Sequence, residues 1–107
     1  MIATVIGDGG WGSALALVLH RNGHAPRVWG PDAAYSAEVR ATRRNPRFLP
    51  GVELPEGIVW TADPAEALAG SEAVVFVVPS KYARATLERF KDAWTAAGRP
   101  PVVSATK

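Results

Sequence analysis

The amino-acid sequence predicts an α/β domain with a doubly wound parallel sheet, and three observations support this. An apolar strand-like run, residues 2–6, leads directly into a glycine-rich turn, residues 7–12, and then into a helix-forming stretch. Strand-like and helix-like segments alternate along the rest of the chain. Asp32 follows Gly12 by about twenty positions, the spacing at which dinucleotide-binding folds place an acidic residue. Together these features indicate a Rossmann-type fold.

The glycine turn has the features that a bound pyrophosphate requires. Gly7 allows a sharp turn, Gly9 lacks the Cβ that would block a phosphate, and Gly12 allows close packing of helix on strand. The start of the following helix offers free N–H groups and the positive end of the helix dipole. A glycine triplet alone is weak evidence because many turns contain glycine. Its position between an apolar strand and a helix strengthens the interpretation.

The first helix is expected over about residues 10–22, where Asn22-Gly23 is a stop signal. Apolar positions recur along it at helical spacing and predict the face that packs on the sheet: Ala14, Leu15, Val18 and Leu19. A second strand is expected over residues 27–29.

Pro31-Asp32 opens a second expected helix, about residues 33–43. Asp32 can cap this helix or bind a ribose, and the two roles are compatible. The connector that follows, residues 45–57, is rich in prolines, which lack the N–H that a strand ladder needs. We therefore expect a shaped loop there.

A third strand is expected over residues 58–60, followed by a short helix to Leu68 with Asp63 as its N-cap. Residues 73–78 form the most strand-like run of the chain. They are apolar at every position, as in a parallel strand that is covered on both faces.

The last helix is expected over about residues 82–97, with Ser80 as a cap after Pro79. Its apolar side is predicted to contain Leu87, Phe90 and Trp94. A fifth strand is expected over residues 101–105. Right-handed crossovers then give the sheet order 3-2-1-4-5. The ligand crevice is expected at the carboxyl ends of strands 1 and 4, beside Gly9 and Pro79.

Composition narrows the function classes. The 107 residues are expected to form one domain, residues 1–107, which is too short for a two-domain dehydrogenase and can be half of one. No run reaches the length of a membrane span or has the form of a signal peptide, so a cytoplasmic protein is expected, with no membrane partner. The chain has no cysteine, and His20 and His24 have no nearby carboxylate pair, so no metal site is expected.

Four arginines gather where the second helix is expected to end: Arg40, Arg43, Arg44 and Arg47. The cluster can be favourable charge at a helix end, a site for a ligand phosphate, or a nucleic-acid contact. The first reading is favoured and the last is disfavoured, because no aromatic stacking platform accompanies the arginines. A net charge of +2 by itself names no polyanionic partner, and no nucleic acid is expected.

Five patches, taken in order, resemble the N-terminal region of NAD(P)-dependent glycerol-3-phosphate dehydrogenase. They are residues 7–16, Asn22-Gly23-His24 with Val28-Trp29, the loop 45–52 with Leu54-Pro55, residues 77–80, and the terminal Ser104-Ala105-Thr106-Lys107. The Trp within the turn, the Asn-x-x-aromatic-Leu-Pro loop and the Ser-x-Thr-Lys ending are more specific together than any glycine turn. In that family a large helical substrate domain follows.

The resemblance implies reversible hydride transfer between a nicotinamide cofactor and dihydroxyacetone phosphate, giving sn-glycerol 3-phosphate for glycerolipid synthesis. It implies that Lys107 contacts both cofactor and substrate, and that the catalytic lysine belongs to the following domain, so that no catalytic residue is expected in this chain. The residues expected to bind the cofactor are Gly7, Gly9, Gly10, Trp11, Gly12, Pro31, Asp32, Phe48, Pro79, Tyr82 and Lys107. Taken without the resemblance, Trp11 favours core packing and Lys107 an exposed chain end.

Two departures from the family pattern concern the cofactor. Asp8 stands where a small neutral residue is usual, and a carboxylate there would repel a pyrophosphate unless it pointed away. Pro31 stands where bacterial members often have Arg or His near the 2′-phosphate of NADP. With Asp32 present, NAD is favoured over NADP, although Arg43 or Arg44 can substitute for the missing cation.

Two alternatives remain. One is the cofactor domain of a ketopantoate or 6-phosphogluconate type reductase, which the loop at residues 45–55 argues against. The other is a stand-alone NAD(H)-binding or redox-sensing module, which predicts a homodimer through the exposed edge of the fifth strand.

Overall fold

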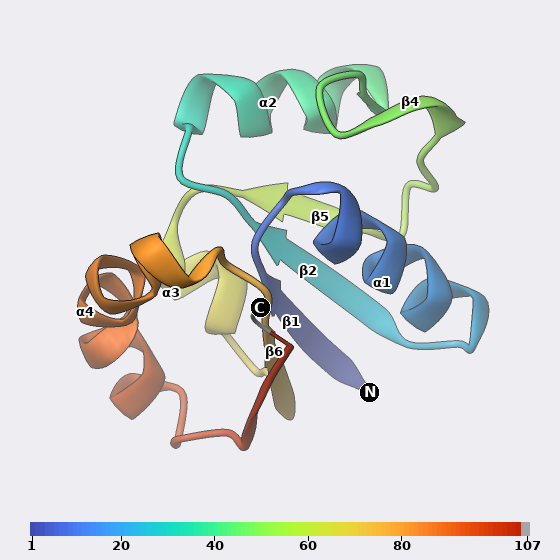
Figure 1. The fold of residues 1–107 in the computed structure, drawn as a ribbon. Coiled ribbons are helices and arrows are strands. Elements are labelled where there is room, and N and C mark those ends of the chain that lie inside the picture. Colours follow the sequence, from blue (N-terminus) through green and yellow to red (C-terminus); the bar gives the residue numbers. More distant parts are fainter. Residues whose placement is uncertain (106–107) are drawn as a thin grey trace.

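The computed structural model describes residues 1–105, and it has a central parallel sheet with helices on both faces (Figure 1). The five strands lie in the order β5-β2-β1-β6-β7. Their bounds are β5 Val59–Thr61, β2 Ala25–Trp29, β1 Ile2–Ile6, β6 Ala73–Phe76 and β7 Val102–Ser104. Counted over the parallel strands, this is the predicted order 3-2-1-4-5, so the doubly wound fold is confirmed.

Two core layers enclose the sheet. On one face lie α1, Gly10–Arg21, and α2, Ala33–Thr42, whose side chains share a buried cluster with Val5 and Val28 of the sheet. On the other face lie α3, Pro64–Leu68, and α4, Ser80–Ala96, which pack with Ile6, Trp29 and Phe76. Successive strand residues point to opposite faces, which is why neighbours such as Val5 and Ile6 belong to different clusters.

The central strands end together, and this creates the edge on which a ligand crevice can form. In the parallel register, Ile6 of β1 pairs with Trp29 of β2 and with Phe76 of β6. Beyond these residues the Gly7 N–H still donates to the Trp29 carbonyl at 2.9 Å, and the Val77 N–H to the Ile6 carbonyl at 2.9 Å. The chain then leaves the sheet on both sides, as expected at a point where the strand order reverses.

The connector predicted as a loop instead contains a small antiparallel hairpin, β3 (Arg44–Asn45) with β4 (Leu49–Glu53). The expectation that prolines would prevent a ladder was wrong. The register shifts between the pairs Arg44–Glu53 and Asn45–Leu49, and Pro50 falls in this irregular stretch. A proline outside the paired positions removes no ladder hydrogen bond.

Two helix faces differ from the predicted ones. In α1 the fully buried residues are Gly12, Ser13 and Ala16. Of the predicted face, Leu19 packs against the core cluster, whereas Val18 is 51% exposed. Small residues face the sheet because the glycine turn brings the helix start very close to β1. In α4 Phe90 is buried and Trp94 packs against the core cluster, both as predicted. Leu87 is 53% exposed and borders the same cavity as Val102 of β7.

The start of α4 also differs from the prediction. Pro79 is the N-cap residue, it makes no side-chain cap bond, and Ser80 is already the first helical residue. The Ser80 cap was therefore a wrong prediction. The apolar run 73–78 is shorter as a strand than predicted, because after Phe76 the chain turns away from β1 to start α4.

The β7 edge of the sheet is open within residues 1–105. Val102, Val103 and Ser104 are all exposed, with Val103 at 63%. Among the same residues, no helix combines the length and apolar character that crossing a membrane requires.

Candidate functional site

A crevice of about 710 Å³ lies at the carboxyl ends of β1 and β6, where the fold predicts a ligand site. Nearly all the predicted cofactor-binding residues line it: Gly7, Gly9, Gly10, Trp11, Gly12, Pro31, Phe48, Pro79 and Tyr82. Asp32 does not line the crevice, and Lys107 lies outside the described residues. Sequence reasoning thus identified residues from four separated segments that the fold brings together.

The glycines of the turn differ in what a side chain would meet. Gly7 has φ +130°, which few other residues adopt. A Cβ on Gly12 would stand 2.0 Å from the Gly7 carbonyl oxygen, so this position must be glycine. A Cβ on Gly9 would meet no protein atom within 4 Å, because it would point into open space. Gly9 therefore leaves room for a ligand and not for the protein itself.

Three aromatic side chains from different elements border the crevice. Trp11 at the start of α1 is 58% exposed, Phe48 is 40% exposed, and Tyr82 in α4 is 54% exposed. The alternative of core packing for Trp11 is excluded by this exposure. Flat apolar side chains around a crevice provide surfaces for a ring or an apolar chain.

A buried hydrogen-bond network fixes the turn from below. Asn45 is 1% exposed, and its side-chain amide donates to the Asp8 carbonyl at 3.2 Å and to Ser13 Oγ at 2.9 Å. Ser13 Oγ also donates to the Asp8 carbonyl at 3.1 Å. The Tyr35 hydroxyl donates to the side-chain Oδ1 of Asn45 and accepts from the Arg47 backbone N–H at 3.1 Å. Asn45 thus holds the glycine turn in position. This role was not predicted from the sequence, where Asn45 was noted only as part of the family resemblance.

Asp32 acts as the N-cap of α2, as one of its two predicted roles required. Its Oδ1 accepts from the Tyr35 N–H at 3.0 Å, and its Oδ2 lies 4.0 Å from Arg47 Nη1. The Arg47 guanidinium also stacks over the Tyr35 ring, 4.0 Å from its centroid. Both oxygens of the Asp32 carboxylate thus already interact with groups of the protein.

From the sequence, the Asp8 carboxylate is expected to repel a pyrophosphate unless it points away. Its carboxylate turns toward Gly30, so closely that a Cβ on Gly30 would stand 2.0 Å from Asp8 Oδ2. Partial burial raises the pKa of Asp8, while its own backbone hydrogen bond and the charge of Arg47 act in the opposite direction. The signal that sequence analysis missed is the pair Asp8 and Gly30, two residues that strand register places side by side.

The arginine cluster is mostly structural. Arg40 pairs with Glu66 at 3.2 Å, Arg43 donates to the Ile58 carbonyl at 3.1 Å, and Arg44 lies 4.0 Å from Glu53. These partners favour the interpretation that three of the four arginines are structural charges near a helix end and not ligand-binding groups. Arg47 is the member of the cluster that lies nearest the Asp8 and Asp32 carboxylates.

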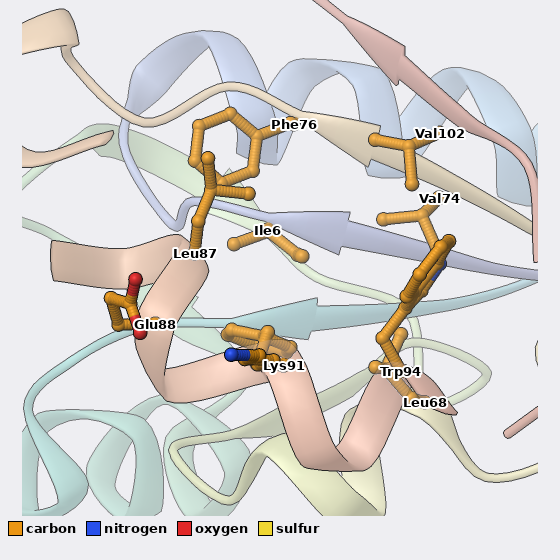
Figure 2. Close-up of a pocket in the computed structure, with 10 residues that line it drawn as sticks. Ile6, Leu68, Val74, Phe76, Leu87, Glu88, Lys91, Trp94 and Val102 are labelled. Atoms are coloured by element: carbon orange, nitrogen blue, oxygen red, sulfur yellow. The ribbon is translucent and has the colours of Figure 1, made fainter. Parts of the chain in front are cut away.

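A second cavity, of about 400 Å³, lies between α4 and the β6–β7 side of the sheet (Figure 2). Its wall is mainly apolar, with Phe76, Leu87, Val102 and Trp94 around it and the charged groups of Glu88 and Lys91 on α4. None of the predicted site residues lines it. Within residues 1–105, no three His, Asp or Glu side chains gather as a metal site would require.

The doubly wound sheet and the glycine-turn crevice define a Rossmann-type nucleotide-binding domain. Residues 2–107 match the family model described as the NAD-dependent glycerol-3-phosphate dehydrogenase N-terminus. The chain therefore belongs to this family.

Similar proteins agree with the family match. Glycerol-3-phosphate dehydrogenase [NAD(P)+] of Rhodospirillum rubrum is 43% identical over 103 residues, which cover 96% of this chain and 29% of the relative. The Geobacillus thermodenitrificans protein of the same name is 48% identical over 86 residues, covering 80% of this chain and 25% of the relative. The chain thus spans between a quarter and a third of the length of these relatives.

Solved structures show the same fold. A crystal structure of glycerol-3-phosphate dehydrogenase from Coxiella burnetii has a TM-score of 0.90 and 32% identity, covering 99% of this chain and 32% of that one. A 2-dehydropantoate 2-reductase from Methylococcus capsulatus has a TM-score of 0.69 at 19% identity, covering 100% of this chain and 34% of that one, which shows the fold alone. The reductase alternative is therefore not favoured.

Proposed function

We propose that the crevice binds NAD(H) or NADP(H) and that the chain is the cofactor-binding part of a glycerol-3-phosphate dehydrogenase. The observation that carries this proposal is the open space at Gly9 beside the start of α1. A nucleotide pyrophosphate needs such a place, where backbone can approach it and a helix N-terminus can stabilise its charge. The residues present therefore fit the cofactor.

Backbone groups supply the phosphate contacts. The N–H groups in the first turn of α1 have no acceptor within the helix, and in this turn they belong to Gly10, Trp11 and Gly12. The helix dipole adds the equivalent of about half a positive charge at the same point. The turn thereby binds an anion without a lysine or arginine side chain.

The exposed aromatic residues position the rest of the cofactor. Trp11, Phe48 and Tyr82 lie around the crevice and can cover an inserted dinucleotide, while Pro79 closes its side next to β6. Such apolar cover orients a ring and reduces its contact with water. Pro31 borders the end where β2 stops.

The proposed reaction is reversible hydride transfer between NAD(P)H and dihydroxyacetone phosphate, with sn-glycerol 3-phosphate as the reduced product. The nicotinamide supplies or accepts the hydride, and the protein positions it. We propose that Lys107 contacts cofactor and substrate, and that the proton donor to the carbonyl oxygen comes from the remainder of the enzyme. Support comes from the names and the greater lengths of the relatives. The 107-residue chain alone is then expected to bind cofactor without turnover, in the cytoplasm as its natural compartment.

The test is calorimetric titration of the chain with NADH and with NADPH, using Gly9→Val and Ala96→Val. Both variants introduce a valine, but Gly9 lines the crevice and Ala96 is an exposed residue of α4 away from it. Gly9→Val is expected to abolish binding with the circular dichroism spectrum unchanged, while Ala96→Val binds normally. Normal binding by Gly9→Val would remove the pyrophosphate assignment.

A further inference from the structure

The end of β2 lacks the side chain that dinucleotide-binding folds use to recognise the adenosine ribose. In such folds an acidic residue near the end of the second strand accepts hydrogen bonds from the ribose hydroxyl groups. Here β2 ends at Trp29, and the next residue is Gly30, which has no side chain. Asp32, the acid that sequence spacing suggested, lies two residues further on and caps α2.

The carboxylate of Asp8 fills the place that a residue-30 side chain would take. Its Oδ2 lies 2.0 Å from the ideal Cβ position of Gly30. The two backbones are held beside each other by the bond from the Gly7 N–H to the Trp29 carbonyl, at 2.9 Å. On its other side Gly30 is fixed to β5, because its N–H donates to the Thr61 carbonyl at 3.0 Å. An acid is therefore present at the ribose end of the crevice, but it comes from the glycine turn.

Asp8 is held in this orientation and still lines the crevice. Its carbonyl accepts from Ser13 Oγ at 3.1 Å and from Asn45 Nδ2 at 3.2 Å, which fixes the backbone of the turn. The residue is half-buried and borders the crevice that also contains Pro31. Its carboxylate can thus meet a ligand without a change in the fold.

The charges around Asp8 favour a neutral diol over a phosphate. Asp8 and Asp32 are two carboxylates, and Arg47 is the guanidinium that interacts with both. Arg47 lies 4.0 Å from the Asp32 carboxylate and stacks on Tyr35. A 2′-phosphate would add two negative charges beside two carboxylates and one cation, whereas ribose hydroxyl groups donate hydrogen bonds to a carboxylate.

We propose that Asp8 determines the cofactor specificity of this protein: its carboxylate accepts from the 2′- and 3′-hydroxyl groups of NAD(H) and excludes the 2′-phosphate of NADP(H). This inference rests on the proposed function. It assigns the selecting acid to the glycine turn and not to the end of β2 or to Asp32.

The experiment is calorimetric titration with NADH and NADPH of the wild-type chain and of the variants Asp8→Ala, Asp8→Asn and Asp32→Asn. The wild type is expected to prefer NADH. Asp8→Ala and Asp8→Asn should both narrow the preference for NADH over NADPH by about tenfold or more, which corresponds to about 1.4 kcal/mol. The reason is that each variant removes the charge that repels the 2′-phosphate at close range. Asp32→Asn is the matched control. We expect it to change the ratio of NADH to NADPH affinity less than the two Asp8 variants do.

The outcomes separate the two proposals. The Asp8 assignment would be overturned if the wild type preferred NADPH. It would also be overturned if the ratio of NADH to NADPH affinity were the same in the wild type and in both folded Asp8 variants. Either result would leave the cofactor-binding function standing. A folded wild-type chain that binds neither dinucleotide would overturn both. Asp8→Asn keeps the shape of the side chain and so provides a folded variant if Asp8→Ala disturbs the turn.

Discussion

At the scale of single residues, the glycines of the turn have separate reasons for being glycine. Gly12 lacks a side chain because the protein backbone is already there, whereas Gly9 lacks one while nothing of the protein is there. The sequence motif alone cannot distinguish these cases, since it gives all three glycines the same weight. The distinction matters because the fold requires Gly12, whereas Gly9 leaves room for the proposed ligand.

This difference predicts losses of stability of very different size for two alanine variants. Gly12→Ala would place a Cβ 2.0 Å from a carbonyl oxygen and should destabilise the fold. We expect a loss of roughly 3 kcal/mol or more, the upper part of the range for overpacking. Gly9→Ala adds a Cβ in open space and should cost about 1 kcal/mol or less as a weaker N-cap. Urea unfolding of both variants measures the difference, and equal losses would contradict the packing account.

Asp8 predicts a specific pH dependence of stability. Burial raises its pKa in the folded state above the ordinary carboxyl value, so the folded state holds this proton more tightly than the unfolded state. The stabilisation from the protonated carboxyl is present below the unfolded pKa and is lost as pH rises through the folded pKa. Asp8→Asn should therefore raise the melting temperature at pH 7 and lose that advantage as the pH falls below about 4. A variant that is less stable than the wild type at pH 7 would contradict this.

At the scale of elements, Asn45 of β3 links the hairpin to the glycine turn through hydrogen bonds of its side chain. Its side chain is buried and donates to two acceptors, one of which is the Asp8 carbonyl. The hairpin thereby supports the crevice from outside the five-stranded sheet. This explains why an amide residue stands at the end of β3.

Asn45→Ala should leave the Asp8 carbonyl and Ser13 Oγ with fewer partners and lower the free energy of unfolding by about 1–3 kcal/mol. Asn22→Ala is the control, because that side chain makes its 2.8 Å bond at an exposed helix end. The control should lose clearly less. Chemical denaturation tests both, and a similar loss in the two variants would argue against the buried network.

Sequence patterns predicted the order of elements well and their buried faces less well. The apolar run before the glycine turn and the cap at Asp63 identify their elements because local residues decide them. Helical periodicity could not show that Val18 is exposed, since that depends on how closely α1 approaches β1. The hairpin was not predicted because Pro50 was expected to prevent strand pairing, whereas it lies outside the paired positions. The proposed role of Asp8 depends on its closeness to Gly30, and a contact between residues so far apart in the chain is not visible in local sequence.

At the scale of the whole molecule, the crevice and the β7 edge of the sheet differ in how far other elements cover them. The crevice side is built from residues of several elements, whereas the β7 edge exposes Val102 and Val103. An exposed apolar edge strand is a surface on which another strand can pair.

This edge predicts self-association of the 107-residue chain at high concentration. Val103→Lys should reduce it, because a charged residue on an edge strand opposes pairing. Val18→Lys is the matched control, an exposed valine on a helix at 51%. Light scattering after size exclusion measures the oligomeric state. An equal effect of both lysines, or a monomer at all concentrations in the wild type, would contradict the role of the edge.

The crystal structure of the chain with bound NADH tests the central claim most directly. We expect the pyrophosphate at the start of α1 over Gly9, the aromatic residues against the dinucleotide, and the Asp8 carboxylate within hydrogen-bond distance of the adenosine ribose. A dinucleotide bound elsewhere, such as the cavity between α4 and β7, would contradict the account, and so would a ribose that contacts Asp32 alone.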